Sequence, residues 1–409
     1  MQPTSNLDRI PMLDALRGFA LCGILLANLL SFTGAVYITV DDLSHTDWLT
    51  RSVLFAIDFF VEGKFYSLFS ILFGIGCAIQ WQRISSQGTQ FVSLWYRRMG
   101  ILLIIGLVHM YLIWYGDILT LYACLGLLLP LLIKLNRTLM LRLIILLLVL
   151  PLVIFAVRYF TADAPFWYQS ASVVARLHQA WGLDDMSRIA MFTSDNPIIV
   201  LQSNITGALQ RPMSYLQTGR VFKVLGQFLF GFWVGCYLFP QLHHRWTPQT
   251  KVVIGLVIVA IACNLIYAGI KNIFASPFML TPIGVVQALA YHIGSTTMAI
   301  CYILAMGYIW RQGRLRKFFD PLILLGRMSL TNYLGQSVIG ILIFYGYGFS
   351  LMGETPFSLV PVIAGFILLI QWQSSKFWLQ RYPHGPIETL WRWSTYARFP
   401  ATKSSFNHD

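Results

Sequence analysis

The feature that most constrains this chain is a series of continuous apolar runs, many of them about 18 residues or longer. Hydrophobic residues make up 57% of the 409 residues and charged residues only 11%, whereas a soluble domain carries about 25% charged residues. Runs of this length span a bilayer when they fold as helices. Because they do not alternate with polar residues, they exclude a transmembrane β-barrel. The sequence therefore predicts an all-α, polytopic membrane helical bundle.

The apolar runs predict about ten transmembrane helices, most of them near the roughly 20 residues that a bilayer requires. We place these helices at 13–35, 60–82, 99–115, 117–135, 140–158, 222–239, 252–271, 283–310, 325–348 and 357–379. The segment 48–63 carries Asp58 and Glu62, so it is either part of the second span or an interfacial helix that leads into it. The turn at 114–117 is so short that it predicts a tight hairpin.

Lysine and arginine residues cluster on one side of the predicted membrane, from Arg9 to Lys403. The opposite loop, 36–51, holds three aspartates and only one basic residue, Arg51. By the positive-inside rule, both termini are cytoplasmic. The segment 159–221 then lies outside, where we expect short amphipathic helices at the interface.

Three regions follow: an N-terminal helical bundle at 1–158, the outer segment at 159–221, and a C-terminal helical bundle with a cytoplasmic tail at 222–409. The formal net charge of +13 lies in short clusters beside apolar runs, which indicates membrane topology rather than nucleic-acid binding. The six cysteines all lie inside apolar segments without a C-x-x-C pair, so we expect core residues and no metal site. The first helix lacks a small-residue cleavage site, which argues against a removed signal peptide.

The first predicted helix carries a polar stripe. Arg17 and Asn28 are eleven positions apart, which places them within about 20° of one helix face and roughly 16 Å apart along the axis. Asp14 lies one turn before Arg17. Ionisable residues inside a membrane usually face a bundle interior or a wet cavity, so we expect Arg17 and Asn28 to face one continuous chamber. The alternative is that Arg17 snorkels to the interface while Asn28 joins two helices.

Two further groups of polar residues permit either a structural or a ligand-binding role. Lys64 lies at the outer membrane edge, close after two acidic residues, where it forms a surface ion pair or contacts a ligand. Asn332 and Gln336 share a helix face with Ser329, and such a face either joins helices or lines a substrate cavity. Near the C-terminus, Glu388 and Arg392 are spaced for an ion pair on a short interfacial helix.

The predicted hairpin brings together candidate catalytic groups. His109 lies just inside the outer interface, and the turn can direct Asp117 back toward it, with Tyr115 nearby. A carboxylate fixes the tautomer of an imidazole and stabilises its protonated form, as a general base requires. Elsewhere, His45 lies in the first outer loop, where a histidine usually has no special role. Phosphate-binding loops, dinucleotide fingerprints and metalloprotease or G-x-S-x-G motifs are absent from the sequence.

Five blocks in order resemble the bacterial YeiB-like family, whose C-terminal half is called domain-of-unknown-function family 418. They are L-D-x-x-R-G at 13–18, G-K-F-Y-S-L-F-S-x-L-F-G at 63–74, G-L-x-H with G-D-I-L at 106–119, G-R-M-x-L-T-N-Y at 326–333 and G-P-x-E-x-x-W-R at 385–392. The resemblance covers nearly the whole chain and implies a protein of the bacterial cytoplasmic (inner) membrane, but the family itself has no well-defined activity.

The R-G-x-A helix is also similar to that of transmembrane acyltransferases, the acyltransferase-3 group and the lysosomal heparan-α-glucosaminide acetyltransferase. The former group has a histidine eleven positions after the arginine, and the latter enzyme has an asparagine, as Asn28 is here. The latter also has a catalytic histidine in the order His-x-x-Trp, which His45 and Trp48 match, although with a longer spacing from Asn28. The resemblance therefore offers two candidate bases, His109 and His45.

The resemblance and the polar stripe together imply a transmembrane acyltransferase. Acyl-CoA, such as acetyl-CoA, is then the cytoplasmic donor, with Arg97 and Arg98 among the groups that meet its phosphates. The acceptor is a glycan, a lipid or a small amine or alcohol at the outer face, and membrane lipids and a second copy in a homodimer are the other expected partners. A transporter for a small solute and a non-catalytic scaffold are the alternatives.

Overall fold

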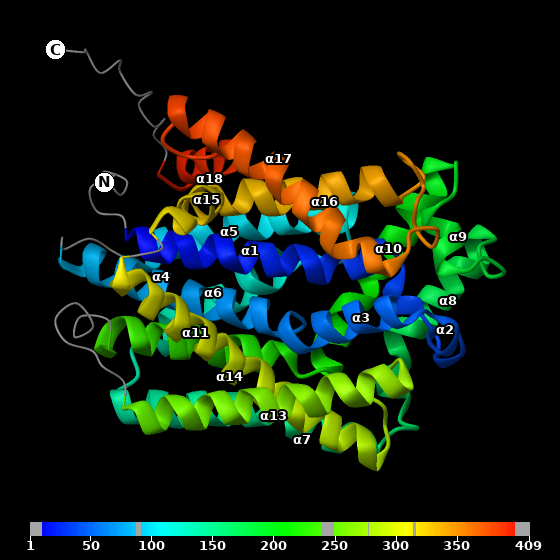
Figure 1. Cartoon of the computed structure of the whole chain (residues 1–409), viewed down its shortest axis with the longest axis horizontal. Coiled ribbons are helices and arrows are strands. Elements are labelled where there is room, and N and C mark those ends of the chain that lie inside the picture. Colours follow the sequence, from blue (N-terminus) through cyan, green and yellow to red (C-terminus); the bar gives the residue numbers. More distant parts are fainter. Residues whose placement is uncertain (1–9, 87–90, 239–248, 277, 314–315, 397–409) are drawn as a thin grey trace.

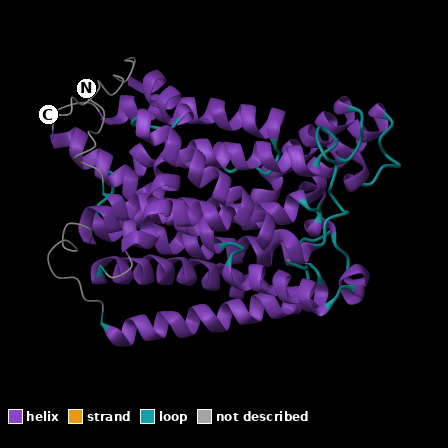
Figure 2. Ribbon diagram, turned by 45° about the horizontal axis from the view of Figure 1, so that its top comes forward, coloured by secondary structure: helices purple, strands orange, loops and turns teal. Residues whose placement is uncertain are grey.

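The computed structural model describes residues 10–86, 91–238, 249–276, 278–313 and 316–396. Within these ranges the regular elements are helices, and they form one bundle with loops gathered at its ends (Figures 1 and 2). Eight helical segments are long and apolar enough to cross a membrane, and two shorter apolar helices lie among them. The predicted polytopic helical bundle is therefore confirmed.

The eight long segments and the two shorter helices follow the predicted order. They are α1 (Pro11–Phe32), α3 (Trp48–Phe60) with α4 (Lys64–Ser86), α5 (Phe91–Val108) with a π-helical extension (His109–Ile113), α6 (Leu119–Leu132), α7 (Arg137–Phe160), α11 (Arg220–Trp233) with a π-helical extension (Val234–Leu238), α13 (Thr250–Phe274), α14 (Pro282–Gln312), α16 (Ser329–Phe344) and α17 (Val360–Arg381). The shorter ones are α6 and α16. Exposed apolar side chains on α13, such as Ile254, Ile258 and Ile261, fit contact with lipid.

The segment 48–63 is a helix of its own, α3, rather than the start of a single straight span. Gly63 separates it from α4 with a φ of +83°, a conformation that glycine adopts without strain. A Cβ at this position would lie 2.7 Å from the ring of Tyr291. The break therefore lets the chain turn while Tyr291 packs directly against the backbone.

One end of the bundle carries α15 (Arg316–Arg327) and α18 (Pro386–Tyr396), and we call it the inner end. The chain enters α1 at this same end (Figure 1), so the first and last described helices agree with termini on one side. The start of the predicted ninth span is wrong, because α15 ends at Arg327 and α16 begins at Ser329. α15 packs closely on α1, where a Cβ on Gly326 would lie 1.8 Å from the backbone oxygen of Asp14.

The opposite, outer end carries α2 (Val40–His45), α8 (Gln169–Trp181), α9 (Arg188–Phe192) and α10 (Pro197–Gln217) (Figure 1). The segment 159–221 is helical, as predicted, but α10 is 21 residues long and partly buried rather than a short surface helix. The side chain of Asn204 on α10 donates to the backbone oxygens of Met110 and Tyr111 and accepts from the backbone nitrogen of Tyr115. These bonds supply polar partners to the irregular π-helical backbone, which explains the burial of α10.

Candidate functional site

Two cavities lie end to end along the polar face of α1. The inner cavity has a volume of about 300 Å³ and the outer cavity one of about 200 Å³. Three residues line both: Ile24, Ile118 and Tyr333. Arg17 lines the inner cavity and Asn28 the outer one. These three side chains form a wall that both cavities share, so the polar face of α1 lines two adjoining cavities where the sequence predicts one continuous chamber.

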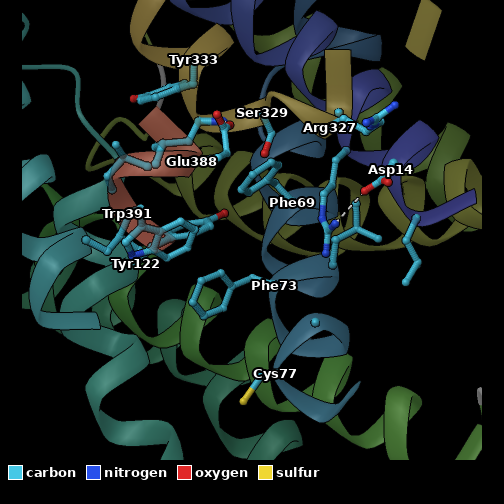
Figure 3. A pocket seen from close by; sticks show the side chains of 18 of the residues that line it. Asp14, Phe69, Phe73, Cys77, Tyr122, Arg327, Ser329, Tyr333, Glu388 and Trp391 are labelled. Atoms are coloured by element: carbon cyan, nitrogen blue, oxygen red, sulfur yellow. Dashed lines mark hydrogen bonds and ion pairs between the residues drawn. The ribbon is translucent and has the colours of Figure 1, made fainter. Parts of the chain in front are cut away.

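The inner cavity is lined by four arginines, two carboxylates and several aromatic rings (Figure 3). Arg17 forms an ion pair with Asp14 at 3.0 Å, drawn as the dashed line in Figure 3. The guanidinium carbon of Arg98 lies 4.0 Å from the ring centroid of Trp391, and the indole nitrogen of Trp391 donates to the backbone oxygen of Arg98 at 2.9 Å. Specific partners thus orient both Arg17 and Arg98 at the wall of the cavity.

The second carboxylate of this cavity, Glu388, caps a helix of a distant part of the chain. It accepts hydrogen bonds from the backbone nitrogens of Leu330 and Thr331, at 2.6 and 3.1 Å, and from the Thr331 hydroxyl at 2.5 Å. These donors belong to the first turn of α16, whose backbone N–H groups have no partner within the helix. Burial, which outweighs these hydrogen bonds, raises the pKa of Glu388 above its ordinary value. These hydrogen bonds of Glu388 join α18 to α16.

The outer cavity holds Asn28, three basic side chains and one carboxylate, Glu62. Lys271 on α13 lies 2.5 Å from Glu62 and 2.7 Å from Asp58. The other two basic residues are Arg211, near the end of α10, and Arg220, at the start of α11. α10 thus contributes to the cavity wall as well as to the outer cap.

Lys64 does not line either cavity. It is fully buried at the break between α3 and α4, where its ammonium group donates to the backbone oxygen of Asp58 at 2.5 Å. The expected surface ion pair is wrong on two points: the site is buried, and Lys271, from a distant helix, forms the ion pairs with both carboxylates. Because burial of an amine is costly without a hydrogen bond, the fully buried Lys64 needs such a fixed acceptor.

The predicted contact between His109 and Asp117 is present. The Nδ1 atom of His109 lies 2.9 Å from a carboxylate oxygen of Asp117, and both residues are buried. Asp117 also accepts from the backbone nitrogens of Leu119 and Thr120, so it caps α6 while it orients the imidazole. The sequence predicts this pair from the tight hairpin, which turns the carboxylate of Asp117 back toward His109.

His109 lies directly behind the wall between the cavities. Its ring centroid is 5.3 Å from that of Tyr333 and 6.4 Å from that of Trp114. Tyr333 lines both cavities and Trp114 lines the outer one, whereas His109 lines neither. Its Nε2 atom is buried and has no hydrogen-bond partner in the part of the chain that the structure describes.

Other predicted site residues lie away from the cavities. His45 is exposed on α2, where its Nδ1 atom contacts the backbone oxygen of Asp41, and Arg97 is exposed on α5. Tyr115 shares a hydroxyl contact of 3.0 Å with Tyr37 at the outer end. None of the three lines either cavity.

The polar face of α16 joins helices. Asn332 donates to Ser375 at 3.1 Å, and Gln336 donates to Gln371 at 3.0 Å. Both partners lie on α17, and neither Asn332 nor Gln336 lines a cavity. The contacts correspond to the helix-joining interpretation of these residues.

Comparison with known proteins identifies relatives along the whole chain. The sequence is 30% identical over 411 residues to the uncharacterized protein YxaH of Bacillus subtilis, covering 97% of this chain and 96% of that protein. It is 27% identical to the uncharacterized protein YeiB of Escherichia coli, with 94% and 96% covered. A family model described as "Protein of unknown function (DUF418)" matches residues 233–398. The chain belongs to the YeiB-like DUF418 family. No solved structure matches it.

The segment that matches the DUF418 family model contains α13 to α18. Of the three basic residues that line the outer cavity, this segment contains only Lys271. Sequence reasoning on this YeiB-like chain also missed Arg211 and Arg220. One signal was present: these basic residues lie on the side that the positive-inside rule leaves poor in lysine and arginine. Membrane orientation therefore does not explain the positions of these basic residues.

Proposed function

We propose that this YeiB-like protein is a transmembrane acyltransferase that moves an acyl group from cytoplasmic acyl-CoA to an acceptor at the outer face. The observation that supports the proposal is the arrangement of the two cavities. They approach one wall from opposite ends of the bundle, and the buried His109–Asp117 pair lies directly behind that wall. The likeness of the α1 motif to that of known membrane acyltransferases adds to this support.

The donor enters from the inner end. A cavity of about 300 Å³ is at the lower limit for ligand pockets, so it takes the thioester end of the donor while the nucleotide remains at the mouth. Arg98, Arg327 and Arg392 line this cavity, and arginine forks match phosphate oxygens. The acceptor enters the outer cavity, where Asn28 lies.

Transfer takes place at the shared wall, once the Tyr333 side chain moves aside to admit His109. The acceptor hydroxyl or amine attacks the thioester carbonyl, and His109 Nε2 takes the acceptor proton. Asp117 stabilises the resulting imidazolium through Nδ1. The amide of Asn28 donates to the developing oxyanion. The carbon–sulfur bond then breaks, and His109 returns the proton to the thiolate, so that the products are the acylated acceptor and free CoA.

The experiment combines purified full-length protein, radiolabelled acetyl-CoA and bacterial envelope extract. We expect label transfer by the wild type and a loss of about 10²–10⁴-fold in His109→Gln, because a general base contributes this much. His45→Gln is the matched control and retains activity. Activity in His109→Gln with loss in His45→Gln would reassign the base, and the absence of both label transfer and CoA binding would overturn the proposal.

Transport of a small solute is the second candidate, because two cavities in series with a thin wall also suit alternating access. Proteoliposomes that contain wild type or His109→Gln separate the two functions. Equal solute uptake by both proteins, without acyl transfer by either, would favour transport.

A further inference from the structure

The outer cavity carries more positive than negative charge. Arg211, Arg220 and Lys271 line it, against the single carboxylate of Glu62. Lys271 is already paired with Glu62 and Asp58, and the buried amine of Lys64 donates to the backbone oxygen of Asp58 within the electrostatic influence of the same two carboxylates. These two lysines and two carboxylates balance one another. The two arginines are left without a compensating carboxylate.

The contacts of both arginines are aromatic. The guanidinium carbon of Arg211 lies 5.0 Å from the ring centroid of Tyr215, and that of Arg220 lies 5.6 Å from the same ring. Arg220 also lies 4.9 Å from the ring of Tyr66. Among the described residues, neither arginine forms an ion pair, and Nε of Arg211 is buried without a hydrogen-bond partner.

A third cation lies behind this pair. Lys223, one turn along α11 from Arg220, is 1% exposed and donates to the hydroxyl of Ser295 at 2.5 Å. Its ammonium nitrogen lies 5.2 Å from the ring of Tyr66 and 4.6 Å from that of Tyr291. Among the described residues, it too has aromatic and hydroxyl partners rather than a carboxylate, so it is a third basic group without an ion pair.

Such an arrangement is costly unless an anion completes it. A buried ionic group without a counter-charge loses its hydration, and a nearby tyrosine ring returns only part of that loss. Guanidinium groups form bidentate bonds with phosphate and carboxylate oxygens. Two guanidinium groups facing one cavity match a group with several oxygens and up to two negative charges, which describes phosphate better than a carboxylate.

We propose that the outer cavity binds a phosphate group through Arg211 and Arg220. This inference rests on the proposed function and names its acceptor class: a phosphate-bearing molecule of the outer leaflet or the outer compartment. Tyr215, whose ring contacts both arginines, also donates its hydroxyl to the backbone oxygen of Asp117. The phosphate site and the His109–Asp117 pair are therefore joined by a single side chain, which fixes the bound acceptor relative to the base.

The test measures binding rather than catalysis. Full-length protein, delipidated in a neutral detergent, is unfolded thermally at constant ionic strength in chloride, acetate or inorganic phosphate. We expect phosphate to raise the melting temperature by about 2 °C or more, with less effect from acetate. Arg211→Gln and Arg220→Gln remove the shift, whereas Arg176→Gln, an exposed arginine of the outer cap, retains it. Arg220→Lys, which keeps the charge, checks that any loss is not a folding defect.

Two further arms locate the site and identify the source of the phosphate. The double variant Asp14→Asn/Arg17→Gln neutralises the ion pair of the inner cavity as a unit and should leave the phosphate shift intact. Dioctanoyl phosphatidylglycerol, dioctanoyl phosphatidylcholine and glycerol 3-phosphate are then compared. Preference for phosphatidylglycerol identifies an anionic lipid headgroup, and preference for glycerol 3-phosphate identifies a soluble phosphate ester; either supports the proposal.

An equal shift in acetate, or a phosphate shift that survives both Arg211→Gln and Arg220→Gln, would overturn the proposal. The outcome is separable from that of the proposed function. Acetyl-CoA binding and label transfer are measured on the same protein, so transfer without an effect of these arginines refutes only the phosphate site. A phosphate site without CoA binding refutes only the acyltransferase.

Discussion

The inner and outer cavities lie end to end on α1, but they hold their arginines differently. At the inner end, Arg17 forms an ion pair with a carboxylate, and Arg98 packs on an indole ring. At the outer end, the carboxylates pair with lysines, and Arg211 and Arg220 contact tyrosine rings. Asp14 and Trp391 orient the inner arginines Arg17 and Arg98. The outer arginines Arg211 and Arg220 have no carboxylate partner among the described residues. The comparison indicates that lysine pairs with the buried carboxylates of the outer end, which leaves Arg211 and Arg220 as the basic groups that the proposed phosphate would meet.

The contrast also extends to how each cavity is assembled. The sequence blocks at 13–18, 326–333 and 385–392 meet around the inner cavity. There, Glu388 caps the start of α16, which lies within the block at 326–333. The outer cavity also takes lining residues from the blocks at 63–74 and 106–119, but its basic residues come from the junction of α10 and α11 and from α13, which contain no recognisable motif. Sequence blocks therefore mark the inner cavity better than they mark the basic residues of the outer one.

The largest expected effect concerns the ion pairs of the outer cavity. Lys271→Met leaves the carboxylates of Asp58 and Glu62 without their common partner, which costs about 3–5 kcal/mol of unfolding free energy at a buried site. Arg17→Met is the inner counterpart and should cost about 1 kcal/mol or less, because the Arg17 side chain is 32% exposed. Thermal unfolding of both variants in the same detergent compares them.

Equal losses from Lys271→Met and Arg17→Met would contradict the distinction between the two ends. A rescue experiment isolates the electrostatic part. The triple variant Asp58→Asn/Glu62→Gln/Lys271→Met removes both carboxylates together with the lysine that pairs with them and should recover part of the stability that Lys271→Met loses.

The next effect concerns Asn28 and depends on the proposed acyl transfer. Removal of one oxyanion donor lowers the catalytic rate by about 10²–10³-fold, so Asn28→Ala should show such a loss. Acetyl-CoA affinity should stay unchanged, because Asn28 lines only the outer cavity. Ser31→Ala, which alters the same cavity one turn further along α1, is the control and should keep its rate. Loss of CoA affinity in Asn28→Ala would place the donor in the outer cavity and reverse the assignment.

Much of this fold follows from the sequence because apolar periodicity reports helices directly. The ten spans and the approach of Asp117 to His109 both follow from local spacing and one tight turn. The outer cavity does not, for a physical reason: the sequence shows that Arg220 breaks the positive-inside rule, but it does not show which groups Arg220 meets. Lys271 ends a span, and its pairing with Glu62 depends on which helices become neighbours. Spacing along one helix carries no information on that choice.

The wall between the cavities provides a smaller effect. Tyr333→Ala removes the largest side chain that both cavities share and should join them. A joined space admits water to the thioester, so we expect free CoA to form without an acceptor, which a thiol assay detects. Tyr333→Phe keeps the ring and loses only the hydroxyl, which accepts from the backbone nitrogen of Ile118 at 3.3 Å. CoA release at the same rate from both variants would show that the ring does not separate the cavities.

The smallest effect concerns the inner helix cap, where burial raises the pKa of Glu388. An acid with a higher pKa in the folded than in the unfolded state binds its proton more tightly when folded. Its contribution to stability is therefore complete below the unfolded value, near 4.5, and is lost as the pH rises through the folded value. We expect the melting temperature of wild type relative to Glu388→Gln to be highest near pH 4.5 and to fall toward neutral pH. The substitution itself costs about 1 kcal/mol, as for other weakened caps.

The control for this cap is Glu354→Gln, which changes an exposed glutamate at the outer end and should leave the dependence of melting temperature on pH unaltered. A wild-type advantage over Glu388→Gln that grows with pH would mean that the ionised carboxylate is the better cap. In that case the donors of α16 outweigh burial at Glu388, and the inner end would hold its anion as firmly as the outer end holds Asp58 and Glu62.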